Sequence, residues 1–232
     1  MRDGPGGSGV AGATWAIVVA AGEGARLGLD RPKAFAALAG RPLLAESLER
    51  LDHCAWVDAV VVAAPAGWEE PAILLAEELA ASKVVSCVTG GATRAESVRE
   101  GLREVAGEAL VVLVHDAARP LVTDDVVERV LAPLSEGFDG VVPALAIADT
   151  LKRVDGHEVV ETVSRDGLVC AQTPQAFLAP ALRRAFEGEV SAATDCASLV
   201  ERAGGRVAVV EGDPRLIKIT TPDDLALVES WL

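Results

Sequence analysis

The chain has 232 residues, of which 50% are hydrophobic and only 3% aromatic, and its formal net charge is −14. The length suits one large α/β domain or two small ones. The negative charge argues against nonspecific binding to nucleic acid, and no apolar run reaches the ~18 residues of a membrane-spanning helix. If the substrates are phosphates, the few basic side chains must gather locally.

The first 13 residues, MRDGPGGSGVAGA, are rich in glycine and lack the basic and apolar regions of a secretory signal peptide. We expect them to form a disordered tail. The cysteines at positions 54, 87, 170 and 196 are far apart and include no Cys-x-x-Cys pair. This spacing favours reduced thiols over disulfides or a metal site, and predicts a cytoplasmic protein.

Continuous apolar runs alternate with amphipathic segments along the rest of the chain. The runs that predict strands are Trp15–Ala21, Ala59–Ala64, Lys83–Val88, Ala109–His115, Gly140–Leu145 and Arg206–Glu211. The segments that predict helices are Leu43–Leu51, Glu69–Ala81, Arg94–Glu104, Val126–Leu134 and Asp223–Leu232. Strands that are apolar on both faces belong in a mostly parallel sheet that is covered on each side. We therefore predict an α/β fold, with residues 14–232 as a single domain around a doubly wound, mostly parallel sheet with helices on both faces.

Residues 149–175 interrupt this alternation. They contain two Asp-Gly pairs, Asp155-Gly156 and Asp166-Gly167, each flanked by β-prone residues, and Asp-Gly is a strong hairpin signal. Since consecutive hairpins do not fit inside a parallel sheet, we expect a β arm that projects from the domain. An isolated two-stranded ribbon is only marginally stable in water. The arm would gain most by packing on a second subunit, which predicts a homodimer.

The loop after the first strand is rich in glycine and reads AAGEGARLGLDRPKAF. Its glycines, Gly22, Gly24 and Gly28, do not follow the G-x-G-x-x-G spacing of a dinucleotide-binding turn, and no helix can begin at once. Two interpretations remain open. The loop is either an ordinary solvated loop or a phosphate cradle, in which backbone N–H groups and the cations Arg26 and Lys33 face anionic oxygens.

The segment GGATRAES follows another predicted strand. Thr93 and Glu96 have the spacing of a helix capping box, which is a purely structural role. The paired glycines and Arg94 are not explained by the cap, because a cation in the first helical turn is unfavourable unless an anion lies near. Both a structural and a functional role remain open for this segment.

Asp116 ends the most apolar predicted strand, within HDAARP. A carboxylate at such a strand end commonly holds a divalent cation, and Mg²⁺ would bridge it to nucleotide phosphates. The structural alternatives are a turn cap or an ion pair with Arg119, and His115 is expected to be structural rather than a ligand. Lys218 lies between two isoleucines in a predicted strand, so its ammonium needs a partner.

Taken in order, the motifs AAGEGARLGLDRPKAF, GGATRAESV, HDAARP, DTLKRV, TVSRDGL, AQTPQAF, TDCASLVE and IKITTPDDL resemble those of the 2-C-methyl-D-erythritol 4-phosphate cytidylyltransferases. The resemblance covers nearly the whole chain after Thr14. It implies a Rossmann-like nucleotidyltransferase fold, a cytoplasmic homodimer joined through the β arm, and Mg²⁺ as cofactor. The implied reaction belongs to the non-mevalonate isoprenoid pathway. It transfers CMP from CTP to 2-C-methyl-D-erythritol 4-phosphate, giving 4-diphosphocytidyl-2-C-methyl-D-erythritol and pyrophosphate.

The resemblance also implies roles for individual residues. The expected catalytic residues are Arg26, Lys33, Arg165 and Lys218. The residues expected to bind CTP are Ala20, Ala21, Gly22, Glu23, Gly24, Arg26, Lys33, Gly91, Arg94, Ser97 and Asp116. The residues expected to bind methylerythritol phosphate are Asp116, Ala117, Thr150, Arg165, Thr173, Thr194 and Lys218. Asp116 is the expected metal ligand.

Three other functions stay open. A ribitol-5-phosphate cytidylyltransferase would share the fold and the glycine-rich loop, although AQTPQAF and HDAARP favour methylerythritol phosphate. A nucleotide-binding module would bind CTP without turnover. An NAD(P)-dependent oxidoreductase would bind a dinucleotide, which the spacing of the glycines disfavours.

Overall fold

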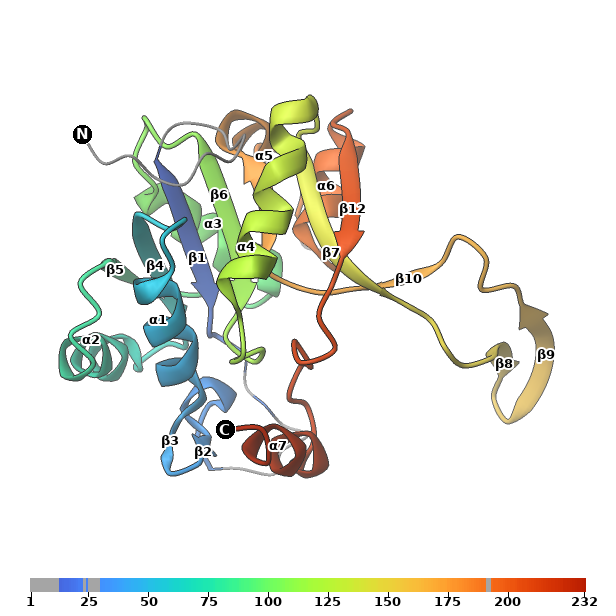
Figure 1. The fold of residues 1–232 in the computed structure, drawn as a ribbon, viewed down its shortest axis with the longest axis horizontal. Helices are drawn as coiled ribbons and strands as arrows, with labels where there is room; N and C mark the ends of the chain where they lie inside the picture. Colours follow the sequence, from blue (N-terminus) through green and yellow to red (C-terminus); the bar gives the residue numbers. More distant parts are fainter. Residues whose placement is uncertain (1–12, 23, 25–29, 191–192) are drawn as a thin grey trace.

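The computed structural model describes residues 13–22, 24, 30–190 and 193–232. An eight-stranded sheet lies at the centre with helices on both sides, and a two-stranded ribbon projects far from this body (Figure 1). The α/β class is therefore confirmed. The predicted tail falls almost entirely on residues outside the described ones, and the division into a tail and one domain over 14–232 stays a prediction.

The central sheet is built around β1. Its strands are β1 (Thr14–Val19), β4 (Ala59–Ala64), β5 (Val84–Thr89), β6 (Val111–Asp116), β7 (Gly140–Ala146), β10 (Val169–Ala171), β11 (Gln175–Leu178) and β12 (Val207–Glu211). β1 pairs in parallel with β4 and β6, β5 lies at one edge beside β4, and β12 lies at the other edge beside β7. In the described part of this sheet, the strands that run antiparallel to their neighbours are β11, between β6 and β7, and β10, along β7. The sheet is mostly parallel, as predicted.

The helices cover both faces of the sheet. They are α1 (Leu43–His53), α2 (Glu69–Glu78), α3 (Arg94–Glu104), α4 (Asp124–Leu131), α5 (Ala179–Ala185), α6 (Cys196–Arg202) and α7 (Pro222–Glu229). Ala16 and Val18 of β1 belong to the core cluster that holds apolar residues of α1, α2 and α4, whereas Ile17 belongs to the cluster of α3, α5 and α6. This alternation follows from the period of two along a strand, and it confirms helices on both faces.

Among the described residues, two short 3₁₀ segments and a small second sheet complete the body. They are η2 (Lys33–Phe35), η3 (Ala132–Glu136), β2 (Ala37–Leu38) and β3 (Arg41–Pro42). Leu38 and Leu43 join Ile219 and Val228 of the C-terminal region in a third, smaller buried cluster. α7 is thereby packed beside β2 and the start of α1.

The capping interpretation of Thr93 and Glu96 is confirmed at α3, and α7 begins with a cap of the same kind. Thr93 Oγ1 accepts a hydrogen bond from Glu96 N at 3.1 Å, and the Glu96 carboxylate accepts one from Thr93 N at 3.0 Å. Thr221 and Asp224 make the same reciprocal pair at the start of α7, where Pro222 occupies the first turn. These contacts satisfy N–H groups that a helix leaves unpaired at its N-terminus.

The arm is a hairpin of β8 (Leu151–Asp155) and β9 (Glu158–Val163), and Gly156 turns the chain with φ of +55°. The prediction of a second consecutive hairpin at Asp166-Gly167 is wrong. Gly167 has φ of +74°, but this turn leads back to the body, because β10 pairs with β7 and not with β9. After the arm, the chain therefore rejoins the main sheet as β10.

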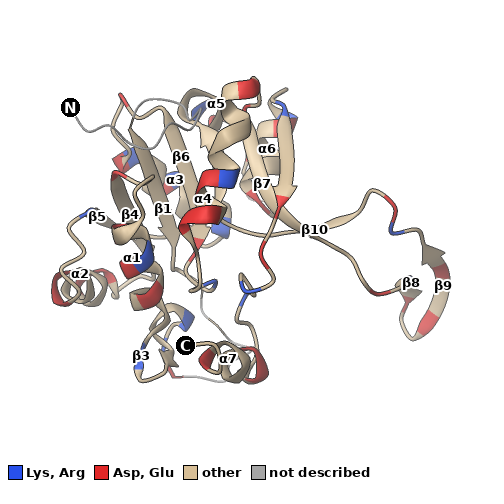
Figure 2. Cartoon of the chain, in the orientation of Figure 1, with Lys and Arg blue, Asp and Glu red and all other residues tan. Residues whose placement is uncertain are grey.

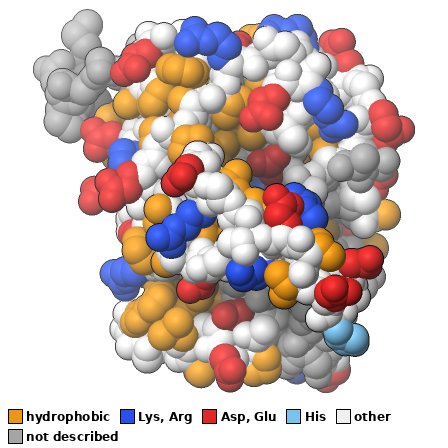
Figure 3. All heavy atoms as spheres, turned by 90° about the vertical axis from the view of Figure 1, so that its right-hand side faces the viewer, with side chains coloured by type: hydrophobic (Ala, Val, Ile, Leu, Met, Phe, Trp, Pro, Cys, Tyr) orange, Lys and Arg blue, Asp and Glu red, His pale blue; other side chains and the backbone are white. Residues whose placement is uncertain are grey.

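The surface mixes charges with scattered apolar groups. Acidic and basic residues are spread over the helices and the arm (Figure 2). On the face that looks along the arm, apolar side chains lie among charged ones (Figure 3). Val154, Val159 and Val160 of the arm are each more than half exposed. Within the described part of the chain, no helix has the length and apolar character to cross a membrane.

Candidate active site

The site lies where β1 and β6 end side by side. Val19 at the end of β1 pairs with Asp116 at the end of β6, while the sheet continues from β1 to β4 on one side and from β6 towards β7 on the other. Such a point, where the strand order reverses, is where open α/β sheets bind ligands. A cavity of about 830 Å³ opens there. The predicted site residues that line it are Ala20, Ala21, Gly22, Gly24, Lys33, Gly91, Arg94, Ser97, Asp116, Ala117 and Lys218.

Asp116 holds two cations from distant parts of the chain. Its Oδ1 accepts a hydrogen bond from Arg94 Nε and its Oδ2 accepts one from Lys218 Nζ, each at 2.7 Å. Burial acts to raise the pKa of Asp116, but the two cations outweigh it and hold the pKa well below its usual range. Asp116 is therefore ionised at neutral pH. Its ion-pair partners are Arg94 and Lys218, and not Arg119 as in the structural alternative.

Arg94 begins α3 and has an anionic partner, while its role toward a ligand stays a prediction. It starts a helix whose cap is structural, and its guanidinium has the anion that a cation at this end requires, since Asp116 lies against it. Its Nη1 also lies 3.7 Å from Cys196 Sγ. Its Nη2 is buried without a hydrogen-bond partner among the described residues. A buried donor of this kind is suited to an anionic ligand in the cavity.

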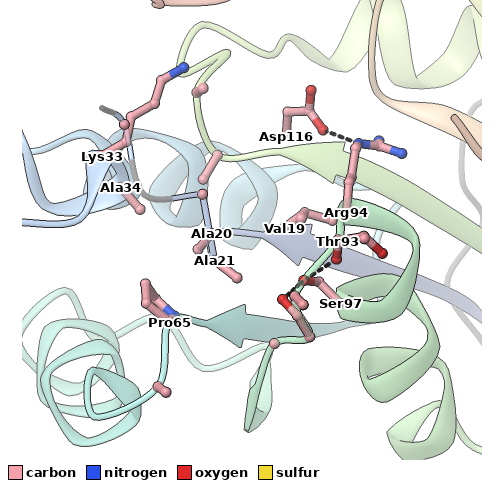
Figure 4. A pocket seen from close by; sticks show the side chains of 18 of the residues that line it. Val19, Ala20, Ala21, Lys33, Ala34, Pro65, Thr93, Arg94, Ser97 and Asp116 are labelled. Atoms are coloured by element: carbon pink, nitrogen blue, oxygen red, sulfur yellow. Dashed lines mark hydrogen bonds and ion pairs between the residues drawn. The ribbon is translucent and has the colours of Figure 1, made fainter. Parts of the chain in front are cut away.

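Lys33 approaches the cavity from the glycine-rich loop. Its backbone N–H donates to Gly22 O at 3.3 Å, after Pro32 with φ of −58°. Gly24 has φ of +70°, and a Cβ added there would lie 2.6 Å from Lys33 Cβ, so this close fold of the loop requires glycine. Figure 4 shows Lys33 on one side of the cavity and the Asp116–Arg94 pair on the other. Glu23 and Arg26, also predicted to bind CTP, lie outside the described residues.

Gly90 and Gly91 form another wall of the cavity. A Cβ added to Gly90 would lie 2.4 Å from Ala21 Cβ and 2.9 Å from Ser97 Oγ, so only glycine fits between these two residues. Ser97 Oγ donates to Thr93 O at 2.9 Å. The paired glycines that the capping box left unexplained thus bring the end of β5 against the loop after β1.

A buried hydrogen-bond chain supports Asp116 from behind. His115 Nε2 lies 3.1 Å from the carbonyl oxygen of Arg119, which can only accept, so this nitrogen carries the proton. Nδ1 then accepts from Thr173 Oγ1 at 3.2 Å, and Thr173 Oγ1 accepts from Asp116 N at 3.0 Å. Burial lowers the pKa of His115 to about 4, so the ring is neutral at pH 7. The structural role expected for His115 fits this geometry.

Lys218 reaches Asp116 from a different local structure than expected. The prediction that it lies in a strand is wrong, because no ladder among the described residues includes those between β12 and α7. The backbone of Ile219 instead donates to Ala118 O at 2.9 Å, which docks this segment beside the loop after β6. The inference that the Lys218 ammonium needs a partner is confirmed by Asp116.

Four of the predicted substrate residues do not line the cavity. Thr150 adjoins the arm, and Arg165, between β9 and β10, donates to the carbonyl oxygens of Ile147 and Ala148. Thr173 is buried behind Asp116, and Thr194 precedes the N-cap residue of α6. Their substrate contacts stay predictions.

The residues that line the cavity do not by themselves fit a resident magnesium ion. Both oxygens of Asp116 are paired with cations, and the described residues include no group of three metal-ligating side chains. Mg²⁺ prefers several oxygen ligands and is commonly held by one or two carboxylates together with substrate phosphates. A metal would therefore depend on oxygens that the nucleotide brings.

Sequence reasoning missed several residues of the cavity wall. Pro65 and Ala66 line it, as do Ala92 and Ala118. Pro65 and Ala66 directly follow β4, and a loop after a neighbouring parallel strand is the signal that could have found them, since carboxyl ends of parallel strands share one edge.

Comparisons with known proteins identify the family of this chain. The family model described as 2-C-methyl-D-erythritol 4-phosphate cytidylyltransferase matches residues 14–232. The enzyme of that name from Nocardia farcinica is 46% identical over 222 residues, covering 95% of this chain and 94% of its own length. The solved structure of the Francisella tularensis enzyme of the same name has a TM-score of 0.81 at 30% identity, and the match covers 95% of this chain and 100% of that chain. That from Thermus thermophilus has a TM-score of 0.76 at 34% identity, covering 93% and 96%. The chain belongs to the 2-C-methyl-D-erythritol 4-phosphate cytidylyltransferase family.

Proposed function

We propose that this chain transfers CMP from CTP to 2-C-methyl-D-erythritol 4-phosphate, releasing pyrophosphate and forming 4-diphosphocytidyl-2-C-methyl-D-erythritol. The observation that carries the proposal is the cation cluster around Asp116 at the joint end of β1 and β6. Family membership names the reaction, and the cluster supplies a place in an acidic protein where two anions can meet.

In this reaction a phosphate oxygen of methylerythritol phosphate attacks the α-phosphorus of CTP. A new P–O bond forms there, the bond from the α-phosphorus to the bridging oxygen breaks, and pyrophosphate leaves with that electron pair. The main obstacle is repulsion between two anions, so the protein contributes positioning and charge neutralisation. No proton transfer or covalent enzyme intermediate is required.

The residues proposed for this task divide into three groups. Lys33, with Arg26 of the same loop, would neutralise the triphosphate, while Lys218 would meet the phosphate of the alcohol. The small residues Ala20, Ala21, Gly22, Gly24, Gly91 and Ser97, with Arg94, would hold the nucleotide. Their small size leaves backbone groups accessible, which suits recognition of a base by N–H and C=O groups.

Magnesium would enter with the nucleotide. Its ligands would be phosphate oxygens, and Asp116 would hold the ion only in exchange for one of its two cation partners. The metal would neutralise triphosphate charge, and Lys33 on the opposite wall of the cavity would share that role.

The arm gives Thr150 and Arg165 a role through a second subunit. These residues do not line the cavity of their own chain, and exposed valines of the arm offer an apolar surface for a partner. We propose a homodimer in which the arm of one subunit completes the alcohol-phosphate site of the other.

The four cysteines are free thiols in the structure, which supports the proposal of a reducing, cytoplasmic setting.

The test measures pyrophosphate release by the purified chain with CTP and Mg²⁺, supplied in turn with methylerythritol phosphate, ribitol 5-phosphate or no alcohol. We expect turnover with methylerythritol phosphate and little with the others. Turnover with ribitol 5-phosphate alone would replace the substrate assignment. CTP binding without any turnover would support the non-catalytic module, and saturable NAD(P)H binding would support the oxidoreductase.

A further inference from the structure

Lys218 stands on a segment without regular secondary structure, yet its ammonium is fixed at Asp116. Residues 212–220 connect β12 to α7 and belong to no helix or strand. A backbone of this kind has no ladder of hydrogen bonds to hold it, so other groups must fix its path. Gln172 and Arg119, which lie outside the segment, donate hydrogen bonds to its backbone carbonyl oxygens.

Gln172 pairs with the backbone of Asp213. Its Nε2 donates to Asp213 O at 2.9 Å and its Oε1 accepts from Asp213 N at 3.0 Å, so the carboxamide takes the place of a neighbouring strand residue. The same Nε2 lies 3.5 Å from Leu216 O. Gln172 is only 4% exposed, so loss of these bonds would leave polar groups unpaired in a buried place.

Gly212 is shaped to this contact. A Cβ added at Gly212 would lie 2.2 Å from Gln172 Oε1 and 3.1 Å from both the carbonyl carbon and oxygen of Ala144. Gly212 N also donates to Ala144 O at 2.8 Å. The chain therefore leaves β12 in close contact with the Gln172 carboxamide. A side chain at position 212 would push the backbone and this carboxamide apart.

Arg119 holds the next part of the segment. Its Nη1 donates to Leu216 O at 2.5 Å and its Nη2 lies 3.4 Å from Ala171 O, the residue before Gln172. Leu216 and Ile219 are both fully buried, and they lie on either side of Ile217 and Lys218. The backbone is thus fixed on both sides of Lys218.

We propose that Gln172 is a positioning residue for Lys218, and that Arg119 assists it. The two side chains fix residues 213–216, so the Lys218 ammonium is held at Asp116 before substrates arrive. The inference rests on the proposed role of Lys218 toward the alcohol phosphate. A misplacement of about 1 Å in a positioned group can lower a rate about 100-fold. Loss of the Gln172 or Arg119 side chain should therefore lower the rate of the reaction.

The test is a double-mutant cycle with Gln172→Leu, Lys218→Met and the combined variant. Pyrophosphate release is measured under kcat/KM conditions for methylerythritol phosphate, and melting temperature is recorded for each protein. We expect Lys218→Met to lower kcat/KM roughly 100-fold or more, and Gln172→Leu roughly 10-fold or more. If Gln172 acts through Lys218, the combined variant falls no further than Lys218→Met alone.

A second cycle replaces Gln172→Leu by Arg119→Leu, which keeps the proposal testable if the first variant does not fold. Arg183→Leu is the matched control, because Arg183 also donates to backbone carbonyls, those of Leu102, Val105 and Ala106, but at the far end of α3. We expect the control to keep kcat/KM near the wild-type value.

Multiplied losses in the combined variants would overturn the inference, because they would mean that Gln172 and Arg119 act independently of Lys218. Wild-type kcat/KM in Gln172→Leu and Arg119→Leu would overturn it as well. Wild-type kcat/KM in Lys218→Met is a different result, since it would remove the proposed role of Lys218 itself.

Discussion

The Nζ of Lys218 donates a hydrogen bond of 2.7 Å to Oδ2 of Asp116, which lies 102 positions earlier in the chain. Arg94 donates to the other oxygen of the same carboxylate. One buried anion thus holds two cations on the wall of the cavity before any substrate binds. Charges that are already oriented cost no reorganisation during the reaction, and this is the basis of electrostatic catalysis.

The first prediction concerns Asp116. Asp116→Asn leaves Arg94 and Lys218 without their shared anion, and removing one partner of a buried ion pair typically costs about 3 kcal/mol or more of folding stability. We expect this loss in urea unfolding, together with a fall in kcat because the cations are no longer fixed. Asp58→Asn is the control, since Asp58 also accepts a hydrogen bond, from Thr14 N at 2.8 Å, but lies outside the cavity. Equal unfolding free energies for wild type and Asp116→Asn would contradict the account.

The second prediction concerns the pH dependence of stability. Burial lowers the pKa of His115 to about 4 from an ordinary value of 6.5. Between these values the unfolded chain binds a proton that the folded chain does not, so the free energy of unfolding falls as pH drops. The contribution of His115 should reach roughly 3 kcal/mol near pH 4. Asp116, whose pKa is depressed, adds to the loss only below its ordinary value of 3.8.

His115→Gln should flatten the decline between pH 6.5 and pH 4 in denaturant titrations, because glutamine does not titrate. An unaltered slope in His115→Gln would show that His115 is not the group responsible.

The third prediction concerns Gly90. Gly90→Ala would force a methyl group against Ala21 and Ser97, so the two loops that we propose to hold the nucleotide must separate. We expect a raised KM for CTP and a stability loss of about 1–3 kcal/mol, as in other overpacked sites. Gly107→Ala is the matched control, since a Cβ at Gly107 meets nothing within 4 Å. Wild-type KM and stability in Gly90→Ala would mean that this contact is unimportant.

The fourth prediction concerns the metal. Since both oxygens of Asp116 are already paired, Mn²⁺ as a paramagnetic probe should bind the chain alone weakly, with a Kd on the order of 1 mM or more. Addition of CTP should create a tighter site that electron paramagnetic resonance detects as loss of the free Mn²⁺ signal. Tight binding to the chain without nucleotide would contradict a metal that enters with the triphosphate.

Local rules predicted most of the fold. Runs such as Ala59–Ala64 are apolar on both faces because the strand is buried on both, and Thr93 with Glu96 marks the start of α3 by reciprocal hydrogen bonds. α5 and α6 were not predicted, since each has only seven residues and too few turns to display a period. β10 was assigned to the arm because its Asp-Gly turn gives no sign that β7 lies within reach.

The site was predictable where it follows strand ends and less so where it depends on tertiary contacts. Asp116 and the glycine-rich loop directly follow β-strand patterns, so their meeting at one edge could be foreseen. The pairing of Arg94 and Lys218 with one carboxylate could not, because it depends on how α3 and the segment before α7 pack. Nor does any local pattern indicate that Thr173 is buried behind Asp116 or that Gln172 holds Asp213.

The most direct test of catalysis by charge neutralisation is steady-state kinetics of Lys33→Ala. We propose that Lys33 acts on the triphosphate as charge builds in the transition state, so its loss should lower kcat about 100-fold or more while KM for CTP changes little. Lys83→Ala is the control, since Lys83 Nζ donates to Cys54 O, away from the cavity. An unchanged kcat with only a raised KM for CTP would contradict the account.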